Sequence, residues 1–267
     1  MNRVVLCLLL GGALLFGGSQ ISIAAPKAKL IAFWNDSEPS SKLPVNHSKW
    51  QEILESYVVT DHPSGVNRFD YDQVSTSDHN KLKSYISDME SVDPRQLNSQ
   101  NQKAFWLNLY NAKVVEMILE SKSGAIRDIS GIWKKKILTV THQKMSLNDI
   151  EHGVLRPIFN DPRIHFGITP ATIGSGDILP VAFTGENVEQ LLEENTKDFF
   201  SKSKERFAIR DNSLVISSIF KWYKKDFGAS TTNIKAFIKK YVDEDVQQQI
   251  DTVSKLSYDY DWSLNRP

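Results

Sequence analysis

Apolar residues recur at helical spacing along much of this chain. Trp50, Ile53, Leu54 and Tyr57 fall on one face of a helix, which predicts an amphipathic helix beginning near Ser48. A second helix is expected where a Ser/Thr/Asp cluster supplies an N-cap. This second helix is expected over residues 76–89. Later segments with helical periodicity predict further helices over residues 187–201, 218–227, 231–241 and 243–253.

The stretch from Asn101 to Ser121 is apolar around most of the circumference of a helix. A helix on the surface has one apolar face, whereas a helix that is apolar on all sides is buried. This stretch is therefore expected to be the central buried helix of the fold.

Several segments are typical of β-strands. Residues 206–218, RFAIRDNSLVISS, place alternating apolar residues on either side of an Asp-Asn turn, and residues 133–146, WKKKILTVTHQKMS, also predict a hairpin. Residues 66–75 are expected to form an edge strand or an extended arm, and the tail from Lys255 a further strand. The alternation in RIHFGI, residues 163–168, indicates another short strand.

Short strands scattered among many helices predict an α+β fold. We expect residues 46–267 to form a helix-rich single domain with a small, mainly antiparallel sheet around the buried central helix. Residues 25–45 contain Pro and Ser and have little periodicity, so an extended or disordered leader is expected there.

Residues 1–24 are typical of a signal peptide. Arg3 provides a positive start, an apolar run extends from Val4 to Phe16, and small residues precede a cleavage site after Ala24. The run is shorter than the roughly 20 residues that a membrane-spanning helix needs. We therefore expect an exported protein, periplasmic or secreted, without a transmembrane anchor after cleavage.

Cleavage changes both the thiol content and the charge of the chain. Cys7 is the only cysteine, so the mature chain would have no thiol for a nucleophile, a thiolate zinc site or an iron–sulfur cluster. Loss of Arg3 leaves 31 basic residues against 32 acidic ones, a formal charge of −1. Nucleic-acid binding needs a basic face, so the expected partners are a small molecule, a peptide or an envelope protein.

Asn108 and Asn111 stand three residues apart and project from nearly the same face of the expected central helix. Two buried carboxamides require hydrogen-bond partners, because each unpaired one would cost on the order of 1 to 3 kcal/mol. They are expected to tie the backbone of neighbouring loops to the helix, or to line a cleft and orient a ligand or a catalytic imidazole.

The segment SLNDIEHGVLRPIF predicts a helix that is capped by Ser146 and ends near Pro157. His152 and Arg156 share one face of it, and Glu151 lies about 100° around the axis. The pattern is typical of a solvated face with an ion pair, and it is also compatible with ligand-binding groups beside the polar segment that follows.

His165 precedes a polar loop, TPATIGSGD, that contains Thr172 and Ser175. A histidine on a strand is commonly structural, yet a nearby hydroxyl would make a nucleophile and base pair. The serine is not in a G-x-S-x-G elbow, because its glycines flank it directly. Glu151, His152 and His165 lack a metal-binding spacing, so no metal and no cofactor is expected. Farther along, Ile219, Phe220, Tyr223 and Phe227 stand at helical spacing and are expected to pack in the core. Trp222, Tyr223 and Asp226 are also compatible with the rim of a cleft.

Five separated motifs together resemble one family, the bacterial and plant domain of unknown function 547. They occur in the family's order and are AFWLNLYNA (104–112), LNDIEHGVLRP (147–157), DPRIHFGI (161–168), VAFTGENVEQLLEENTKDFF (181–200) and ISSIFKWYKKDF (216–227). The resemblance implies an architecture more than a reaction, because the family's activity is not established.

The resemblance also identifies a departure from the family. Many members have Cys-Ala-Ser after the RIHF-like segment and Cys-Pro a few residues later. Residue by residue, these cysteines fall on Pro170 and Ser175, the Ala and Ser on Ala171 and Thr172, and the Pro on Gly176. Both thiol positions therefore lack sulfur in this chain.

Two functions are compatible with these residues. In the first, a hydrolase-like cleft binds a ligand or partner without thiol chemistry, using Asn108, Asn111, Arg156 and His152. In the second, the protein is a hydrolase or acyl transferase for a peptide, amide or ester, in which Ser175 or Thr172 acts with His165 and Glu151. A purely structural envelope protein is a third reading.

Overall fold

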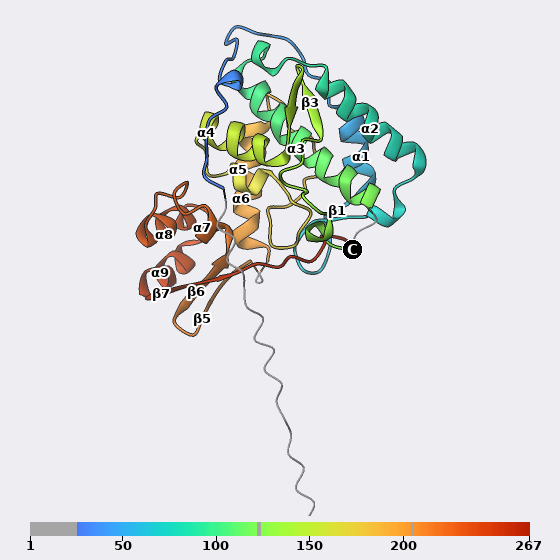
Figure 1. Ribbon diagram of the computed structural model, residues 1–267. Coiled ribbons are helices and arrows are strands. Elements are labelled where there is room, and N and C mark those ends of the chain that lie inside the picture. The colour runs from blue at the N-terminus through green and yellow to red at the C-terminus, as the bar shows by residue number, and fades with distance from the viewer. Residues whose placement is uncertain (1–25, 122–123, 204–205) are drawn as a thin grey trace, which may run out of the picture.

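The computed structural model describes residues 26–121, 124–203 and 206–267. The helix α3 (Ser99–Ser121) lies at its centre, and its Phe105, Trp106 and Leu109 are completely buried. Figure 1 shows α1 (Ser48–Tyr57) and α2 (Thr76–Glu90) on one side of α3. The expectation of a central buried helix is therefore confirmed.

The helices after α3 form the other side of the molecule. The π-helix η5 (Asp149–Leu155) continues directly into α4 (Arg156–Phe159), and α5 (Ile164–Gly167) and α6 (Val188–Ser201) follow. The hydrophobic core around α3 includes Leu192 near the start of α6, whereas Phe199 near its end belongs to a second core. The helix α6 thus joins two cores.

The second core lies in the C-terminal part of the chain. It is enclosed by α7 (Ile219–Trp222), α8 (Thr231–Lys239), α9 (Glu244–Thr252) and a sheet of β5 (Phe207–Arg210), β6 (Ser213–Ser217) and β7 (Lys255–Asp259). Figure 1 shows these elements together beside α6. β5 pairs antiparallel with β6 through a turn in which Asp211 and Asn212 have positive φ, and β7 pairs parallel with β6.

The remaining strands form two short hairpin-like pairs. β1 (Val58–Val59) pairs with β2 (Arg68–Phe69), and β3 (Leu138–Val140) pairs with β4 (Gln143–Met145). The α+β class is confirmed, and both expected hairpins are present. In the described ranges, however, the strands are divided among three small sheets.

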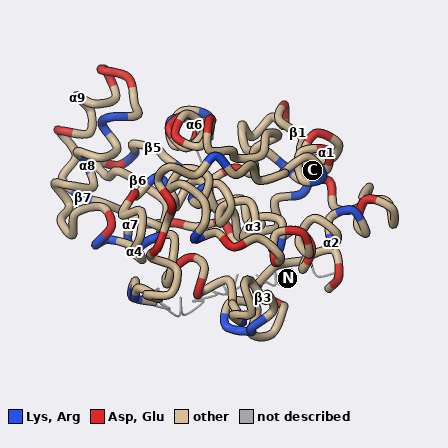
Figure 2. The backbone as a smooth tube through the Cα atoms, turned by 90° about the horizontal axis from the view of Figure 1, so that it is seen from above, with Lys and Arg blue, Asp and Glu red and all other residues tan. Residues whose placement is uncertain are grey.

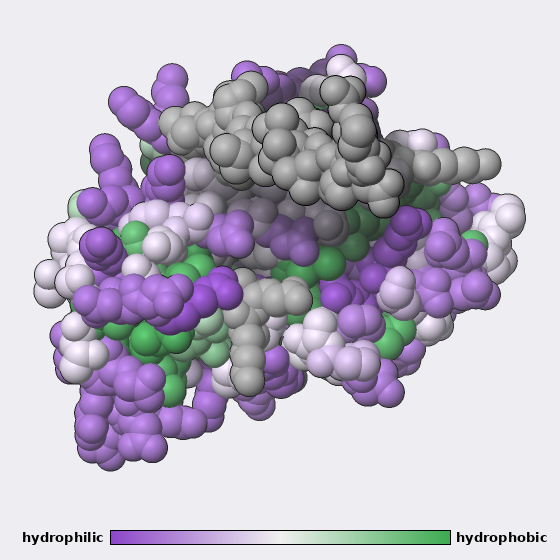
Figure 3. All heavy atoms as spheres, turned by 90° about the horizontal axis from the view of Figure 1, so that it is seen from below, coloured by the Kyte–Doolittle hydropathy of each residue, from purple (hydrophilic) through white to green (hydrophobic). Residues whose placement is uncertain are grey.

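The surface is polar and mixed in charge. Figure 2 shows Lys and Arg interspersed with Asp and Glu around the molecule, and in Figure 3 the uncovered hydrophobic residues of one face are interrupted by hydrophilic ones. Within the described ranges, no helix is both long enough and apolar enough to cross a membrane.

The expectation of a strand at residues 163–168 was wrong. Ile164–Gly167 form the helical turn α5, in which the Ile168 N–H donates to the Ile164 carbonyl at 3.1 Å. Ile164 and Ile168 pack in the core around α3, whereas Phe166 packs in the second core. The apolar residues alternate because this turn lies between two cores. A strand with one buried face would produce the same alternation.

Two further helices differ from the expected ones. The segment before Pro157 is a π-helix, in which the Arg156 N–H donates to the Glu151 carbonyl five residues earlier. The helix expected over 218–227 ends at Trp222, and the chain then turns toward Gly228, which has a φ of 83°.

Residues 26–45 run along the body of the molecule as extended chain with one short 3-10 turn, η1 (Ala32–Trp34). Trp34 is fully buried and its ring lies 5.1 Å from that of Trp106 in α3. In Figure 1 this blue segment passes beside α4. One indole therefore anchors the segment that the sequence left without a defined structure.

Asn108 and Asn111 of α3 fasten the backbone that follows α5. Asn108 donates to the Phe183 carbonyl at 2.7 Å and accepts from the Phe183 N–H at 3.0 Å. Asn111 donates to the Gly167 carbonyl and accepts from the Thr169 N–H, both at 2.9 Å. Each carboxamide thus makes one donor and one acceptor bond to the backbone, as a neighbouring strand would do in a sheet.

The chain near the C-terminus closes over the same loop. The Asn265 N–H donates to the Ala171 carbonyl at 3.1 Å, and the Ile173 N–H donates to the Ser263 carbonyl at 3.0 Å. The Asn265 carbonyl in turn accepts from the Phe69 N–H at 2.8 Å. The polar loop is therefore held by residues 263–265, which are themselves bonded to Phe69 far earlier in the chain.

Replacing Asn111→Ala removes two hydrogen bonds and leaves the buried Gly167 carbonyl and Thr169 N–H without these partners. We expect the free energy of unfolding to fall by about 2 to 4 kcal/mol, measured by urea denaturation. The matched control Gln190→Ala deletes an exposed carboxamide on α6 and should change it by less than about 0.5 kcal/mol. Equal effects of the two substitutions would contradict this role.

His47, at the start of α1, is buried, and its Nδ1 lies 2.7 Å from the hydroxyl of Tyr85 in α2. Burial lowers its pKa from 6.5 to about 4. Because the unfolded chain binds this proton more readily, the contribution of His47 to stability is complete above pH 6.5 and is lost as the pH falls toward 4.

We therefore expect the free energy of unfolding to fall less between pH 7 and pH 4 in the His47→Gln variant than in the wild type. The two decreases should differ by on the order of 3 kcal/mol. Urea unfolding at several pH values measures the difference. The variant His142→Asn, which changes an exposed histidine, should keep the pH dependence of the wild type. The same curve for His47→Gln and the wild type would refute the assignment.

Candidate functional site

A buried polar cluster lies where η5, α4 and α5 meet the C-terminal part of the chain. We define the polar cluster as Glu151, His152, Arg156, His165, Tyr223 and Asp226. Three elements contribute to it: η5 with α4, the single turn α5, and the chain that follows α7. His165 is 4% exposed and Arg156 is 9% exposed, so these groups lie beneath the surface rather than in an open cleft.

Asp226 is the acceptor that joins these elements. His165 Nε2 lies 2.7 Å from Asp226 Oδ2. Arg156 donates from Nε to Oδ2 at 2.6 Å and from Nη2 to Oδ1 at 3.0 Å, a bidentate pair. Although burial alone raises it, the hydrogen bonds from His165 and Arg156 bring the pKa of Asp226 well below its usual range.

Tyr223 packs against both hydrogen-bond partners of Asp226. Its ring is stacked on the His165 imidazole with centroids 4.0 Å apart, and the Arg156 guanidinium lies 4.7 Å from the centre of the same ring. Because the carboxylate of Asp226 accepts only, His165 carries a hydrogen on Nε2. In the neutral imidazole, Nδ1 is therefore the nitrogen able to accept a proton.

Glu151 lies near two phenol hydroxyls, those of Tyr110 in α3 and Tyr223. Burial, together with this carboxylate, raises the pKa of both tyrosines well above the usual value, so the phenols remain protonated. Glu151 is therefore held by the core and does not form the solvated ion pair considered from the sequence.

His152 accepts from Arg156. Its Nδ1 lies 3.0 Å from Arg156 Nη1, which can only donate, and 3.6 Å from Glu151 Oε1. Burial is the largest influence on His152 and lowers its pKa. The imidazole is therefore neutral with its hydrogen on Nε2, and the longer contact with Glu151 is not an ion pair.

The N-terminal segment crosses the outer side of the cluster. The Lys29 and Ile31 N–H groups donate to the carbonyls of His152 and Gly153, each at 2.9 Å. Arg156 Nη1 donates to the Pro26 carbonyl, also at 2.9 Å. Residues 26–31 of the same chain thus cover the outer side of the cluster.

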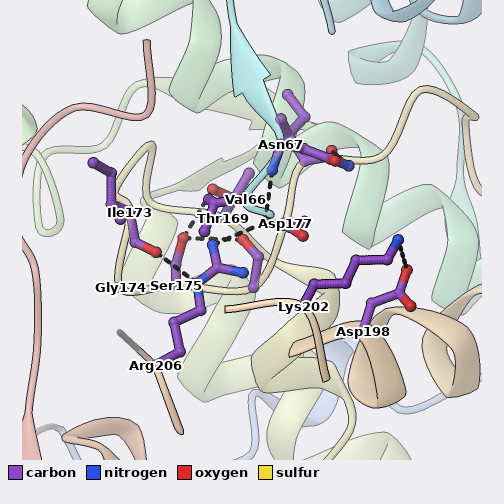
Figure 4. A network of polar contacts seen from close by, with 12 residues as sticks. Val66, Asn67, Thr169, Ile173, Gly174, Ser175, Asp177, Asp198, Lys202 and Arg206 are labelled. Atoms are coloured by element: carbon purple, nitrogen blue, oxygen red, sulfur yellow. Dashed lines mark hydrogen bonds and ion pairs between the residues drawn. The ribbon is translucent and has the colours of Figure 1, made fainter. Parts of the chain in front are cut away.

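The polar loop is fixed by its own hydrogen bonds, as Figure 4 shows around Ser175. Ser175 Oγ donates to the Thr172 carbonyl at 2.7 Å and lies 3.1 Å from Thr169 Oγ1. Thr172 Oγ1 lies 2.7 Å from the hydroxyl of Tyr260. The side-chain hydrogen bonds of both candidate nucleophiles are thus made to groups other than His165.

A buried ion pair supports the same loop from below. Arg206 Nη2 lies 2.8 Å from Asp177 Oδ1, and its Nε donates to the Ile173 carbonyl at 2.7 Å. Figure 4 shows this pair beside Ser175, with the Asn67 N–H donating to Asp177 from another segment. Burial raises the pKa of Asp177 even though Arg206 is adjacent.

The structure brings together only part of the residues selected from the sequence. Glu151, His152, Arg156 and His165 lie in the polar cluster, whereas Asn108 and Asn111 bond loop backbone. Thr172 and Ser175 lie beside Tyr260, whose raised pKa is influenced by Glu151 as well as by its burial. The loop and the cluster are thus neighbours with separate hydrogen-bond networks.

Sequence reasoning missed Asp226 as the partner of His165. The two residues are 61 positions apart, and Asp226 stands in a Lys-rich segment that is typical of an exposed surface. The helix-spaced aromatic residues around it indicated a core, but not one shared with α5. Tyr110 was missed because a tyrosine on an apolar helix is typical of packing.

Metal binding and open cavities do not extend this site. Among the residues that the structure describes, no group of three or more His, Cys, Asp and Glu side chains is arranged to hold a metal ion. An open hollow of about 620 Å³ shares no residue with the polar cluster. It is lined by Ser37, Glu38, Ser41, Lys42, Leu43, Arg95 and Gln96.

Comparison with known proteins gives one match. No curated protein and no solved structure matches the chain. Residues 94–200 match the family model described as Protein of unknown function, DUF547. This range contains α3, the π-helix, His165 and the polar loop, whereas Asp226 and Tyr223 lie beyond it. Residues 94–200 therefore belong to the DUF547 family of proteins of unknown function.

Proposed function

We propose that this protein is an exported cell-envelope protein that binds a ligand or partner non-covalently at the polar cluster, without thiol chemistry. The observation that carries the proposal is that the candidate base His165 and the candidate nucleophile Ser175 each hydrogen-bond to a different group. His165 Nε2 faces Asp226, and the Ser175 hydroxyl donates to the loop backbone at 2.7 Å. A nucleophile and its base must instead bond to each other.

The composition of the cluster supports a binding role. Ionisable groups are costly to bury and concentrate at functional sites, where their pKa values are shifted. Here the Glu151 carboxylate, a guanidinium and two imidazoles are nearly enclosed, Asp226 is partly buried, and the pKa values of Asp226 and His152 are both lowered. A core of apolar residues would hold the same elements without this desolvation cost.

The π-helix is a second support for function at this position. Single π-helical turns are rare and occur frequently at functional sites. The turn here carries Glu151 and His152, and it widens the backbone next to Arg156. Two carbonyls of this turn, those of His152 and Gly153, accept from the N–H groups of Lys29 and Ile31.

One observation favours a hydrolase or acyl transferase as the alternative. An imidazole held by a carboxylate at 2.7 Å is the base and orienting half of a catalytic triad. In this version Nδ1 of His165 would be the base, and Ser175 or Thr172 would have to leave its present partner to reach it. The hydroxyl would also need a stronger base than a thiol does.

Export is supported by the first residues and by the lack of thiols after them. The apolar run, the small residues before Ala25 and the single cysteine within the expected signal all agree with removal of residues 1–24. A chain without cysteine then relies on its two cores rather than on disulfides in an oxidising compartment.

The non-catalytic proposal is tested with p-nitrophenyl acetate and a peptide p-nitroanilide as ester and amide probes. We expect the wild type, Ser175→Ala and Thr172→Val to give the same rate, equal to that of buffer. Circular dichroism controls for folding of each variant. Turnover by the wild type that falls at least about 100-fold in one folded variant would replace the binding proposal with the hydrolase alternative.

Export is tested by expressing the full chain in a bacterium and measuring by mass spectrometry the intact mass of the protein recovered from the periplasm or medium. We expect a chain that begins at Ala25, and we expect Ala24→Lys to accumulate as uncleaved precursor because signal peptidase needs a small residue there. Lys27→Ala, beyond the cleavage site, serves as the control. A recovered wild-type protein that still begins at Met1 would contradict the proposal.

A further inference from the structure

We propose that the outer face of η5 is a binding site for an extended peptide segment of another protein, and that residues 26–31 of this chain occupy the site in the structure. The inference rests on the proposed binding function at the polar cluster and names the class of partner. Four features of the contact carry it: the backbone pairing, the position of Pro157, a notch at Gly153 and the Arg156 side chain.

The backbone pairing has the period of a β-strand. The N–H groups of Lys29 and Ile31, two residues apart, donate to the consecutive carbonyls of His152 and Gly153 at 2.9 Å. Alternate N–H groups of an extended chain point the same way, so this is the way in which a peptide adds to an exposed row of acceptors. Such pairing depends on the backbone and accepts many sequences.

Pro157 explains why these carbonyls are free to accept. In a π-helix the carbonyl of residue i receives the N–H of residue i+5, and in an α-helix that of residue i+4. Pro157 stands at i+5 from His152 and at i+4 from Gly153, and proline has no N–H. Pro157 therefore removes the π-helical donor of the His152 carbonyl and the α-helical donor of the Gly153 carbonyl, and both carbonyls accept from the N-terminal segment instead.

Gly153 provides a notch for one aliphatic side chain. A Cβ atom added to Gly153 would lie 2.4 Å from Cδ1 and 2.7 Å from Cγ1 of Ile31, and its three nearest atoms all belong to that isoleucine. The missing side chain is thus the space that Ile31 fills. A bound segment needs a residue such as Ile, Val or Leu at this position.

Arg156 connects the bound segment with the polar cluster. Its Nε and Nη2 are held by Asp226, and Nη1 donates to the Pro26 carbonyl at 2.9 Å. The guanidinium therefore recognises a backbone carbonyl five residues before the aliphatic side chain. The cluster fixes Arg156 in the orientation that this contact requires.

The resident segment is attached lightly enough to be exchanged. Residues 26–30 are exposed and Ile31 is only partly buried, whereas Trp34 is fully buried a few residues later. Release of residues 26–31 would therefore leave the core anchor in place. The occupant is bound by its main chain and one aliphatic side chain, while the exposed side chains of Lys27 and Lys29 take no part in these contacts.

The experiment uses the intact protein and a fluorescein-labelled peptide with the sequence of residues 26–31, PKAKLI, followed by fluorescence anisotropy. The variant Ile31→Asp removes the side chain that fills the notch and frees the site from its own segment. We expect this variant to bind the labelled peptide at least about tenfold more tightly than the wild type, because a larger fraction of the protein is competent to bind.

Two matched controls locate the binding. Gly153→Ala in the Ile31→Asp protein places a methyl group in the notch, where the three nearest atoms are those of residue 31, and should abolish binding, with folding checked by its melting temperature. A peptide carrying the Ile31→Asp change should not bind to the Ile31→Asp protein. Equal affinities of the wild type and Ile31→Asp, or binding that survives Gly153→Ala, would overturn the inference.

Two other outcomes are separated by the same samples. A wild-type dimer that grows with concentration and is lost in Ile31→Asp would assign the site to a second copy's N-terminal segment and overturn the inference. Cleavage of a bound peptide, seen by mass spectrometry, would refute the non-catalytic function while supporting the peptide site. Absence of peptide binding together with absence of turnover would overturn the peptide site alone.

Discussion

The contact of Asp226 with Arg156 and His165 is the interaction on which the rest of the structure depends. It links α4 and α5, which pack on the core around α3, to the chain after α7, which packs in the second core. Removal of one partner from a buried pair typically costs 3 to 5 kcal/mol, because the other charge is left without compensation. The same contact aligns Arg156 toward the N-terminal segment and holds His165 against Tyr223.

The polar groups of the loop beside the cluster form hydrogen bonds and an ion pair that hold the loop in place. Asn111 satisfies the backbone at its start, Asp177 with Arg206 supports its far end, and the hydroxyl of Ser175 bonds to its own turn. A loop fixed in this way resists the rearrangement that nucleophilic attack would need. The two positions at which the resemblance implies cysteines hold Pro170 and Ser175, and the Ser175 hydroxyl already has hydrogen-bond partners.

Local periodicity was sufficient to predict the helices α1, α2, α3 and α6 and the hairpin of β5 and β6, because each depends on neighbouring residues. It was not sufficient for α5, where alternation came from two cores on either side of one helical turn. The π-helix also could not be read from composition, since Pro157 alone does not say which donor will replace its missing N–H. The partnership of His165 with Asp226 depends on how the two cores pack, and no spacing in the sequence encodes it.

The way in which residues 261–265 close over the polar loop affects the order of folding. Ala171 and Ile173 are paired with Asn265 and Ser263, roughly 90 residues later, and Phe69 is paired with Asn265 across nearly 200. The loop therefore cannot reach its final structure before residues 261–265 are available to pair with it. The helices of the N-terminal half can form earlier, but the polar loop is completed only by a segment that lies about 90 residues farther along the chain.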